Sequence, residues 1–325
     1  MKKAISLILA ALLLLGCLSA CGGSDAGKPA AESGKLKIVV TIFPVYDWVM
    51  NILGDNPAEA EVTLLLGSGV DLHSFQPSAA DILRISTCDL FVYVGGESDA
   101  WVDDALKEAV NKDMTVVNLM DALGDAVKEE ETVEGMEAEE EEEEEAPEFD
   151  EHVWLSLRNA ADLTHSIANA LAVADAAHAE DYRANAAAYI EKLNVLDAEY
   201  RAVVDGAAVK TLLFGDRFPF RYLVDDYGLD YYAAFVGCSA ETEASFETVT
   251  FLARKTDELS LRAVCTIEGS DKRIAETVVQ NTRAKNQIIL TLDSMQSVTA
   301  KDAAAGVTYL SIMEDNLAVL KEALN

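Results

Sequence analysis

The chain has 325 residues, half of them hydrophobic, and a formal net charge of −32 at pH 7. This length is enough for two domains with cores of their own and argues against a small, disulfide-dependent scaffold. The acidic balance argues against nucleic acid as a partner and favours cations.

The N-terminus has the pattern of a signal peptide, which we place at residues 1–20. A basic start precedes an apolar run, residues 4–15, that is too short to span a bilayer. Cys21 follows small residues in a segment like a bacterial lipobox, so we expect it to carry a lipid, with Cys17 as a less convincing alternative. Residues 21–35 would form a flexible leash.

Strand and helix patterns alternate in the first half of the mature chain. Predicted strands are 37–41, 61–66, 90–94 and 115–118, and predicted helices are 45–53, 79–87 and 101–110. Such alternation predicts an α/β lobe, residues 36–172, with a parallel sheet covered by helices.

An acidic tract interrupts this lobe. Fifteen Asp and Glu residues and no Lys or Arg lie from Glu129 to Glu151. Charge repulsion and the lack of apolar side chains predict a disordered loop over residues 128–149. The tract is either a spacer or a means of cation capture, and the second interpretation arises because it ends at His152.

A long helix follows and separates two regions of α/β pattern. Apolar residues from Tyr182 to Val203 recur at helical spacing on one face, so we expect a rigid linking helix within residues 173–206. Beyond it, residues 207–325 predict a second α/β lobe. Its predicted strands are 211–214, 231–235, 263–267 and 287–292, and its predicted helices are 218–227, 246–259, 274–283 and 308–324.

Two of the four histidines fall in loops between a strand and a helix. His73 follows a predicted strand of the first lobe, and His152 immediately precedes a helix that begins near Leu155. Asp216 and Asp293 follow predicted strands of the second lobe. Ligands bind at such carboxyl ends in open α/β sheets, so these four side chains predict a metal site in a cleft between the lobes. The imidazoles suit Zn(II), and the carboxylates leave Mn(II) open.

Three cysteines lie outside the signal: Cys88, Cys238 and Cys265. Their odd number and spacing argue against a disulfide framework or a thiolate zinc site. We expect buried, apolar thiols, although a bridge between Cys238 and Cys265 stays open.

Several motifs resemble the ZnuA/TroA-like metal-binding lipoproteins of bacterial zinc and manganese ABC importers. The matching segments are GVDLHSFQPSAADI (69–82), GESDAW (96–101), DEHVWLS (150–156), ETEAS (241–245), IAET (274–277) and TLDS (291–294). The resemblance implies two lobes joined by a rigid helix, with one metal between them and His73, His152 and Asp293 as ligands. It also implies an extracytoplasmic, lipid-anchored monomer that serves a membrane permease.

The chain departs from this family pattern in two places. The charged loop before His152 contains no histidine, whereas the zinc branch commonly has a histidine-rich loop there. The family's third ligand aligns with Gly215, which has no side chain to offer. Asp216, Glu241, Glu243 or a water could replace it.

Alternatives to a zinc receptor remain at this stage. They are a manganese receptor of the same family, a surface adhesion or interaction protein, and a zinc hydrolase. Against the hydrolase, the chain contains neither H-E-x-x-H nor G-x-S-x-G, and no general base is evident beside the histidines.

Overall fold

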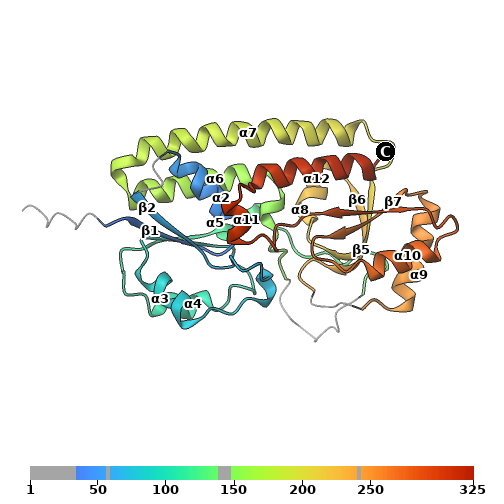
Figure 1. The fold of residues 1–325 in the computed structure, drawn as a ribbon, viewed down its shortest axis with the longest axis horizontal. Coiled ribbons are helices and arrows are strands. Elements are labelled where there is room, and N and C mark those ends of the chain that lie inside the picture. The colour runs from blue at the N-terminus through green and yellow to red at the C-terminus, as the bar shows by residue number, and fades with distance from the viewer. Residues whose placement is uncertain (1–33, 56–58, 138–147, 240–242) are drawn as a thin grey trace, which may run out of the picture. The chain divides into compact units, whose positions relative to one another are not determined.

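The computed structural model describes residues 34–55, 59–137, 148–239 and 243–325. Residues 36–325 form one compact unit built around two four-stranded sheets (Figure 1). The predicted signal peptide and Cys21 lie outside the described residues. Among those described, no helix has the length and apolar character needed to cross a membrane.

The first sheet has strand order β2-β1-β3-β4, with every neighbouring pair parallel. Its strands are β1 (Leu36–Val40), β2 (Ala60–Leu64), β3 (Leu90–Tyr93) and β4 (Thr115–Asn118). Helices α3 (Ala79–Thr87) and α4 (Val102–Lys107) cover one face; α2 (Phe43–Leu53), α5 (Leu119–Leu123) and α6 (Leu157–Ala174) cover the other. Alternate residues of β1 enter different cores, because successive side chains of a strand point to opposite faces.

The second sheet repeats this plan with order β6-β5-β7-β8, again all parallel. Its strands are β5 (Thr211–Phe218), β6 (Asp230–Val236), β7 (Ala263–Ile267) and β8 (Ile288–Leu292). Its helices are α8 (Arg221–Tyr227), α9 (Phe246–Glu258), α10 (Arg273–Asn281), α11 (Ala300–Ala304) and α12 (Tyr309–Ala323). The predicted class of two α/β lobes with parallel sheets is therefore confirmed.

Helix α7, Ala179–Asp205, is the long helix that the sequence predicts. It packs on α6, on α2 of the first lobe and on α12 of the second (Figure 1). Two tyrosines fix it at separate points: Tyr189 donates to the Asp47 carboxylate, and Tyr200 donates to the Met313 carbonyl. The helix therefore contacts both lobes along one side.

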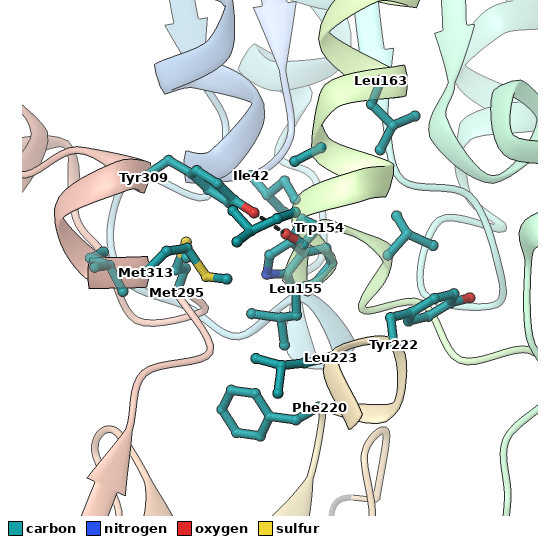
Figure 2. Packing of buried hydrophobic residues seen from close by; sticks show 14 of the residues in the cluster. Ile42, Trp154, Leu155, Leu163, Phe220, Tyr222, Leu223, Met295, Tyr309 and Met313 are labelled. Atoms are coloured by element: carbon teal, nitrogen blue, oxygen red, sulfur yellow. Dashed lines mark hydrogen bonds between the residues drawn. The ribbon is translucent and has the colours of Figure 1, made fainter. Parts of the chain in front are cut away.

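One hydrophobic core continues from lobe to lobe (Figure 2). Trp154 of the short 3-10 helix η5, Val153–Leu155, is buried beside Met295 and Tyr309 of the second lobe. The Tyr309 hydroxyl donates to the Trp154 carbonyl at 2.7 Å, and the Trp154 indole N–H donates to the Ser294 carbonyl at 2.9 Å. These two hydrogen bonds join the lobes at Trp154, two residues after His152.

Strand β5 differs from its prediction. It was expected to end at Phe214, but it continues to Phe218 through a shift in register between Phe214 and Arg217. Asp216 and Arg217 therefore lie within an irregular strand and not in a loop after it. Helix α8 accordingly begins at Arg221, three residues later than predicted.

The acidic segment also differs from its prediction. Residues 128–137 and 148–149 make defined contacts, including a bridge between Glu129 and Phe149, so the predicted disorder does not hold for them. Acids of this segment have cationic partners in the second lobe: Glu131 pairs with Arg221, and Glu134 pairs with Lys255. The prediction counted the acids alone and missed these partners. Residues 138–147 lie outside the described residues.

Candidate metal site

His73 lies in a one-turn 3-10 helix, η3 (Leu72–Ser74), between β2 and α3. Asp71 caps this turn by accepting the His73 backbone N–H at 3.0 Å. Leu72 is buried in the core and anchors the turn from below. His73 therefore lies in a short turn that is held by the Asp71 cap and by the buried side chain of Leu72.

His152 directly precedes η5 and is fully buried. One oxygen of Asp150 accepts the His152 backbone N–H at 2.8 Å and lies 3.0 Å from the ring Nδ1. The three residues after His152 are all buried in the core. The imidazole is thus held by a carboxylate on one side and by core packing on the other.

The two imidazoles face each other through Nε2, with 3.2 Å between the two nitrogens. The Nδ1 atoms point the other way: that of His73 lies 2.8 Å from the Ser98 hydroxyl and 3.4 Å from a Glu151 oxygen. When the carboxylates accept hydrogen bonds from both Nδ1–H groups, each neutral ring carries its lone pair on Nε2, and the two lone pairs face each other. A cation between them would relieve this repulsion.

The spacing also suits zinc. Two nitrogens bound at about 2.0–2.1 Å to a tetrahedral Zn(II) stand about 3.3 Å apart. The 3.2 Å between the two Nε2 atoms is close to that edge length. A metal-ligating histidine commonly donates its other ring N–H to a carboxylate, as the Nδ1 partners here allow.

Glu151 is ionised for a local reason. Burial alone would raise the pKa of Glu151, but hydrogen bonds from His73 and Ser98 outweigh it and lower this pKa below its ordinary value. Ser98 donates its backbone N–H to Glu151 at 2.9 Å. A buried negative charge therefore stands behind the His73 ring and favours a cation on its far side.

Cys238 is the third side chain close to the two imidazoles. One ligand atom each from His73, His152 and Cys238 lies within 4.8 Å of the others, the sole such group found among the described residues. The Cys238 backbone N–H donates to the Glu130 carboxylate at 3.0 Å. Burial and the nearby acids Glu130, Asp150 and Glu151 raise the pKa of the Cys238 thiol well above its ordinary value.

Neither predicted aspartate belongs to this group. Asp216 accepts the backbone N–H of Arg217 at 2.9 Å and of Ile267 at 3.4 Å. Asp293 accepts the backbone N–H of Met295 at 2.7 Å, and burial raises the pKa of its carboxyl. The Asp216 carboxylate thus holds the irregular part of β5 to the end of β7, and the Asp293 carboxylate holds the loop after β8.

Glu268, which the sequence did not single out, is the acid beside Asp293. Its carboxylate accepts from the Ser294 backbone and hydroxyl and from the Gln296 backbone. Burial and the charge of Asp293 raise the pKa of Glu268 to about 7. These hydrogen bonds hold the loop after β8 against Glu268.

Gly215 has a structural reason to be glycine. A Cβ at Gly215 would stand 2.5 Å from the Ala275 Cα of α10, so the strand and the helix meet at backbone distance. Of the other substitutes named above, Glu241 lies outside the described residues and Glu243 is exposed. Residue 215 therefore cannot supply the third metal ligand of the family pattern.

Arg217 brings a positive charge into the cleft. Its guanidinium pairs with Asp71 of the first lobe, and this contact lowers the pKa of Asp71 although burial opposes the shift. The pair lies at a cavity of about 570 Å³ between the lobes, lined also by Asp216, Glu268 and Gln296. Among the described residues, the buried Gln296 Oε1 has no hydrogen-bond partner.

The described thiols Cys88, Cys238 and Cys265 are free, so the bridge between Cys238 and Cys265 does not form. Cys88 and Cys265 are buried, as expected, whereas Cys238 is half-buried beside the histidines. The sequence analysis did not predict that Cys238 lies beside the histidines. Its position could have indicated this, because Cys238 comes two residues after the end of β6, at the carboxyl edge of the sheet, where ligands bind in open α/β folds.

Comparison with known proteins gives one consistent family. The model of the zinc-uptake complex component A, periplasmic, matches residues 38–323. The zinc-binding lipoprotein AdcA of Streptococcus pneumoniae serotype 4 is 34% identical over 326 residues, 99% of this chain and 61% of that protein. The high-affinity zinc uptake system protein ZnuA of Bacillus subtilis is 30% identical over 323 residues, 98% of this chain and 96% of that protein.

A solved structure agrees with these sequence matches. The Zn(II)-bound ZnuA-like domain of Streptococcus pneumoniae AdcA aligns with a TM-score of 0.70 and 32% identity. The alignment covers 90% of this chain and 99% of that domain. The chain thus spans about three fifths of the AdcA proteins but nearly the whole of their ZnuA-like domain and of the Bacillus relative.

Proposed function

Because the chain belongs to the ZnuA family of zinc-uptake components, we propose that it is an extracytoplasmic receptor that captures Zn(II) for an ABC importer. The observation that carries this proposal is the pair of facing Nε2 atoms, 3.2 Å apart, with acids behind both rings. The relatives are named for zinc binding and zinc uptake, which supports the same cargo.

His73 and His152 bind the ion as neutral imidazoles through Nε2. Asp293 and Asp216, on the second lobe, offset part of the charge of the dication. Zn(II) is preferred over Mn(II) because imidazole suits zinc, whereas manganese favours carboxylate and water oxygens. Mn(II) is the competing cargo in the test below.

The partner in this proposal is the membrane permease of the importer. Lipid attached at Cys21 would hold the protein at the outer face of the membrane, with residues 21–35 as a leash. The protein would act as a monomer, since a single chain supplies both histidines. These assignments follow from the family and the N-terminal pattern.

A hydrolytic role has less support. Asp150 and Glu151 are the acids in contact with the imidazoles, and both are engaged in holding them. Neither is therefore free to activate water as a general base. A metal receptor, unlike a hydrolase, needs no general base, and the contacts of Asp150 and Glu151 with the imidazoles are sufficient to hold the two ligands for metal binding.

Elemental analysis and competitive titration test the proposal. The full chain, purified without added metal, should bind one equivalent of zinc and prefer it to manganese. His73→Ala and His152→Ala should each abolish stoichiometric binding, while His165→Ala, at an exposed position on α6, should leave it unchanged. Failure of the parent chain to bind either metal would reject the receptor function.

A further inference from the structure

We infer that Cys238 is the third protein ligand of the metal site, so that the ion is bound by two imidazoles and one thiolate. The inference rests on the proposed function and concerns the position that Gly215 leaves without a side chain. Its basis is the group formed by His73, His152 and Cys238, whose ligand atoms all lie within 4.8 Å of one another.

Strand β5 cannot supply the ligand from residue 215. The missing Cβ of Gly215 would point into the backbone of α10, 2.5 Å from the Ala275 Cα, and not toward the histidines. Arg217, two residues on, carries a positive charge that repels a cation, and its guanidinium is paired with Asp71. Asp216, between them, is not part of the group of ligand atoms around the histidines and accepts the backbone N–H groups of Arg217 and Ile267. We therefore look for the ligand on a neighbouring element.

Strand β6 is the neighbour of β5 and ends at the same edge. Phe218 pairs with Val236, which places Gly237 and Cys238 just beyond the paired ends of both strands. A Cβ on Gly237 would lie 3.1 Å from the Cε1 atom of His152 and 2.9 Å from the Phe218 carbonyl oxygen. Glycine at this position thus lets the chain run directly against the imidazole.

This close approach sets the position of the thiol. Glu130 accepts the Cys238 backbone N–H at 3.0 Å and fixes the residue from the side of the acidic segment. A tetrahedral zinc site needs about 3.6 Å between an imidazole nitrogen and a thiolate sulfur, given bonds of about 2.0–2.1 and 2.3 Å. The present separations, up to 4.8 Å, require only a small movement of the half-buried side chain.

A thiolate changes which cargo the site prefers. Sulfur is a soft ligand that favours Zn(II), whereas Mn(II) favours oxygen ligands. A site of two imidazoles and a thiolate should therefore discriminate against manganese more strongly than one completed by a carboxylate. The acids in contact with the rings, Asp150 and Glu151, lie behind the histidines and do not compete for this position.

Cobalt(II) spectroscopy and metal competition test this assignment. Wild-type chain loaded with Co(II) should show a thiolate-to-cobalt charge-transfer band in the near ultraviolet, and Cys238→Ser should lose it. Cys238→Ser should also narrow the preference for zinc over manganese by about tenfold or more, since loss of a residue that merely orients a metal ligand already costs about 10–100-fold in metal affinity. Cys88→Ser is the matched control, since its hydroxyl can keep the bond to the Ile85 carbonyl.

The outcomes separate this inference from the proposed function. A band that survives in Cys238→Ser, or an unchanged preference for zinc, overturns the thiolate ligand and leaves the receptor intact. Absence of binding in the wild type and in Cys88→Ser overturns both. If Cys238→Ser does not fold, alkylation of the wild type decides: zinc should protect Cys238 from modification, and equal labelling with and without zinc overturns the assignment.

Discussion

At the scale of residues, the site depends on the acids that hold each imidazole. Asp150 contacts both the backbone N–H and the Nδ1 of His152 through one oxygen. The motif around His152 could be recognised from sequence, because the residues are adjacent in the chain. The contacts of Ser98 and Cys238 with the histidines could not be predicted, although both residues lie just after strands, since only the folded sheets bring the β3–α4 and β6–α9 loops to the histidines.

We predict that Asp150→Asn weakens zinc binding by about 10–100-fold, because the amide no longer provides a full negative charge to orient and polarise the ring. Direct titration with a zinc chelator as competitor measures the change. Asp162→Asn, at an exposed position on α6, is the control and should bind as the wild type does. Equal affinity of the two variants would assign Asp150 a role in packing alone.

Arg217 should act in the opposite direction. Arg217→Met removes a guanidinium from the cleft and frees the Asp71 carboxylate, so we expect affinity for divalent cations to rise several-fold. Arg254→Met, on the exposed face of α9, controls for loss of one positive charge. The effect should shrink with added salt. Weaker binding in Arg217→Met would show that the ion pair is needed to hold the lobes in place.

At the scale of elements, the sequence predicts the eight strands of the described residues and most of their helices. Buried parallel strands have continuous apolar runs bounded by turns, which makes them recognisable. The extension of β5 was missed, since Gly215 and Asp216 interrupt the apolar pattern while the strand continues. The segment 128–137 was missed because its order comes from partners in the second lobe, such as Arg221 and Lys255.

Helix α2 contains a buried acid that makes a prediction about pH. Burial raises the pKa of Asp47 to about 6, although the hydrogen bond from Tyr189 of α7 opposes the shift. The folded state then holds the proton more tightly than the unfolded chain, whose pKa is near 4. The resulting stability is present below about pH 4 and is lost as pH rises to about 6.

Asp47→Asn should therefore raise the free energy of unfolding at pH 7–8 by on the order of 1–3 kcal/mol and change it little at pH 4. The asparagine can still accept from the Tyr189 hydroxyl, so the packing of α2 on α7 stays intact. Chemical denaturation at both pH values measures the difference. A variant destabilised equally at both would mean that the carboxylate, and not its charge state, matters for packing.

At the scale of the whole molecule, a single core and α7 connect the lobes. The Tyr309 hydroxyl of the second lobe donates to the carbonyl of Trp154, two residues after His152, and Figure 2 shows this contact between Trp154 and Tyr309. Movement of one lobe on the other would have to break these contacts. This construction favours capture of the ion by small changes in the loops, such as the one that carries Cys238, over a wide closure of the lobes.

The acidic run from Glu139 to Glu145 makes the last prediction. Dispersed carboxylates bind cations weakly, but they attract them to the protein and increase the rate of encounter. Replacing the seven glutamates with glutamine keeps the length and removes the charge. We expect the zinc association rate at low ionic strength to fall several-fold and the difference to vanish at high salt.

Stopped-flow kinetics measure this rate, and a second variant separates charge from length. Deleting the seven residues should reduce the association rate as much as the glutamine variant does, because both remove the same charge. If neither changes the rate, or uptake at limiting zinc, the run is a spacer. Glu130 and Glu131 stay in place in both variants, so their contacts with Cys238 and Arg221 persist and the site itself is left unaltered.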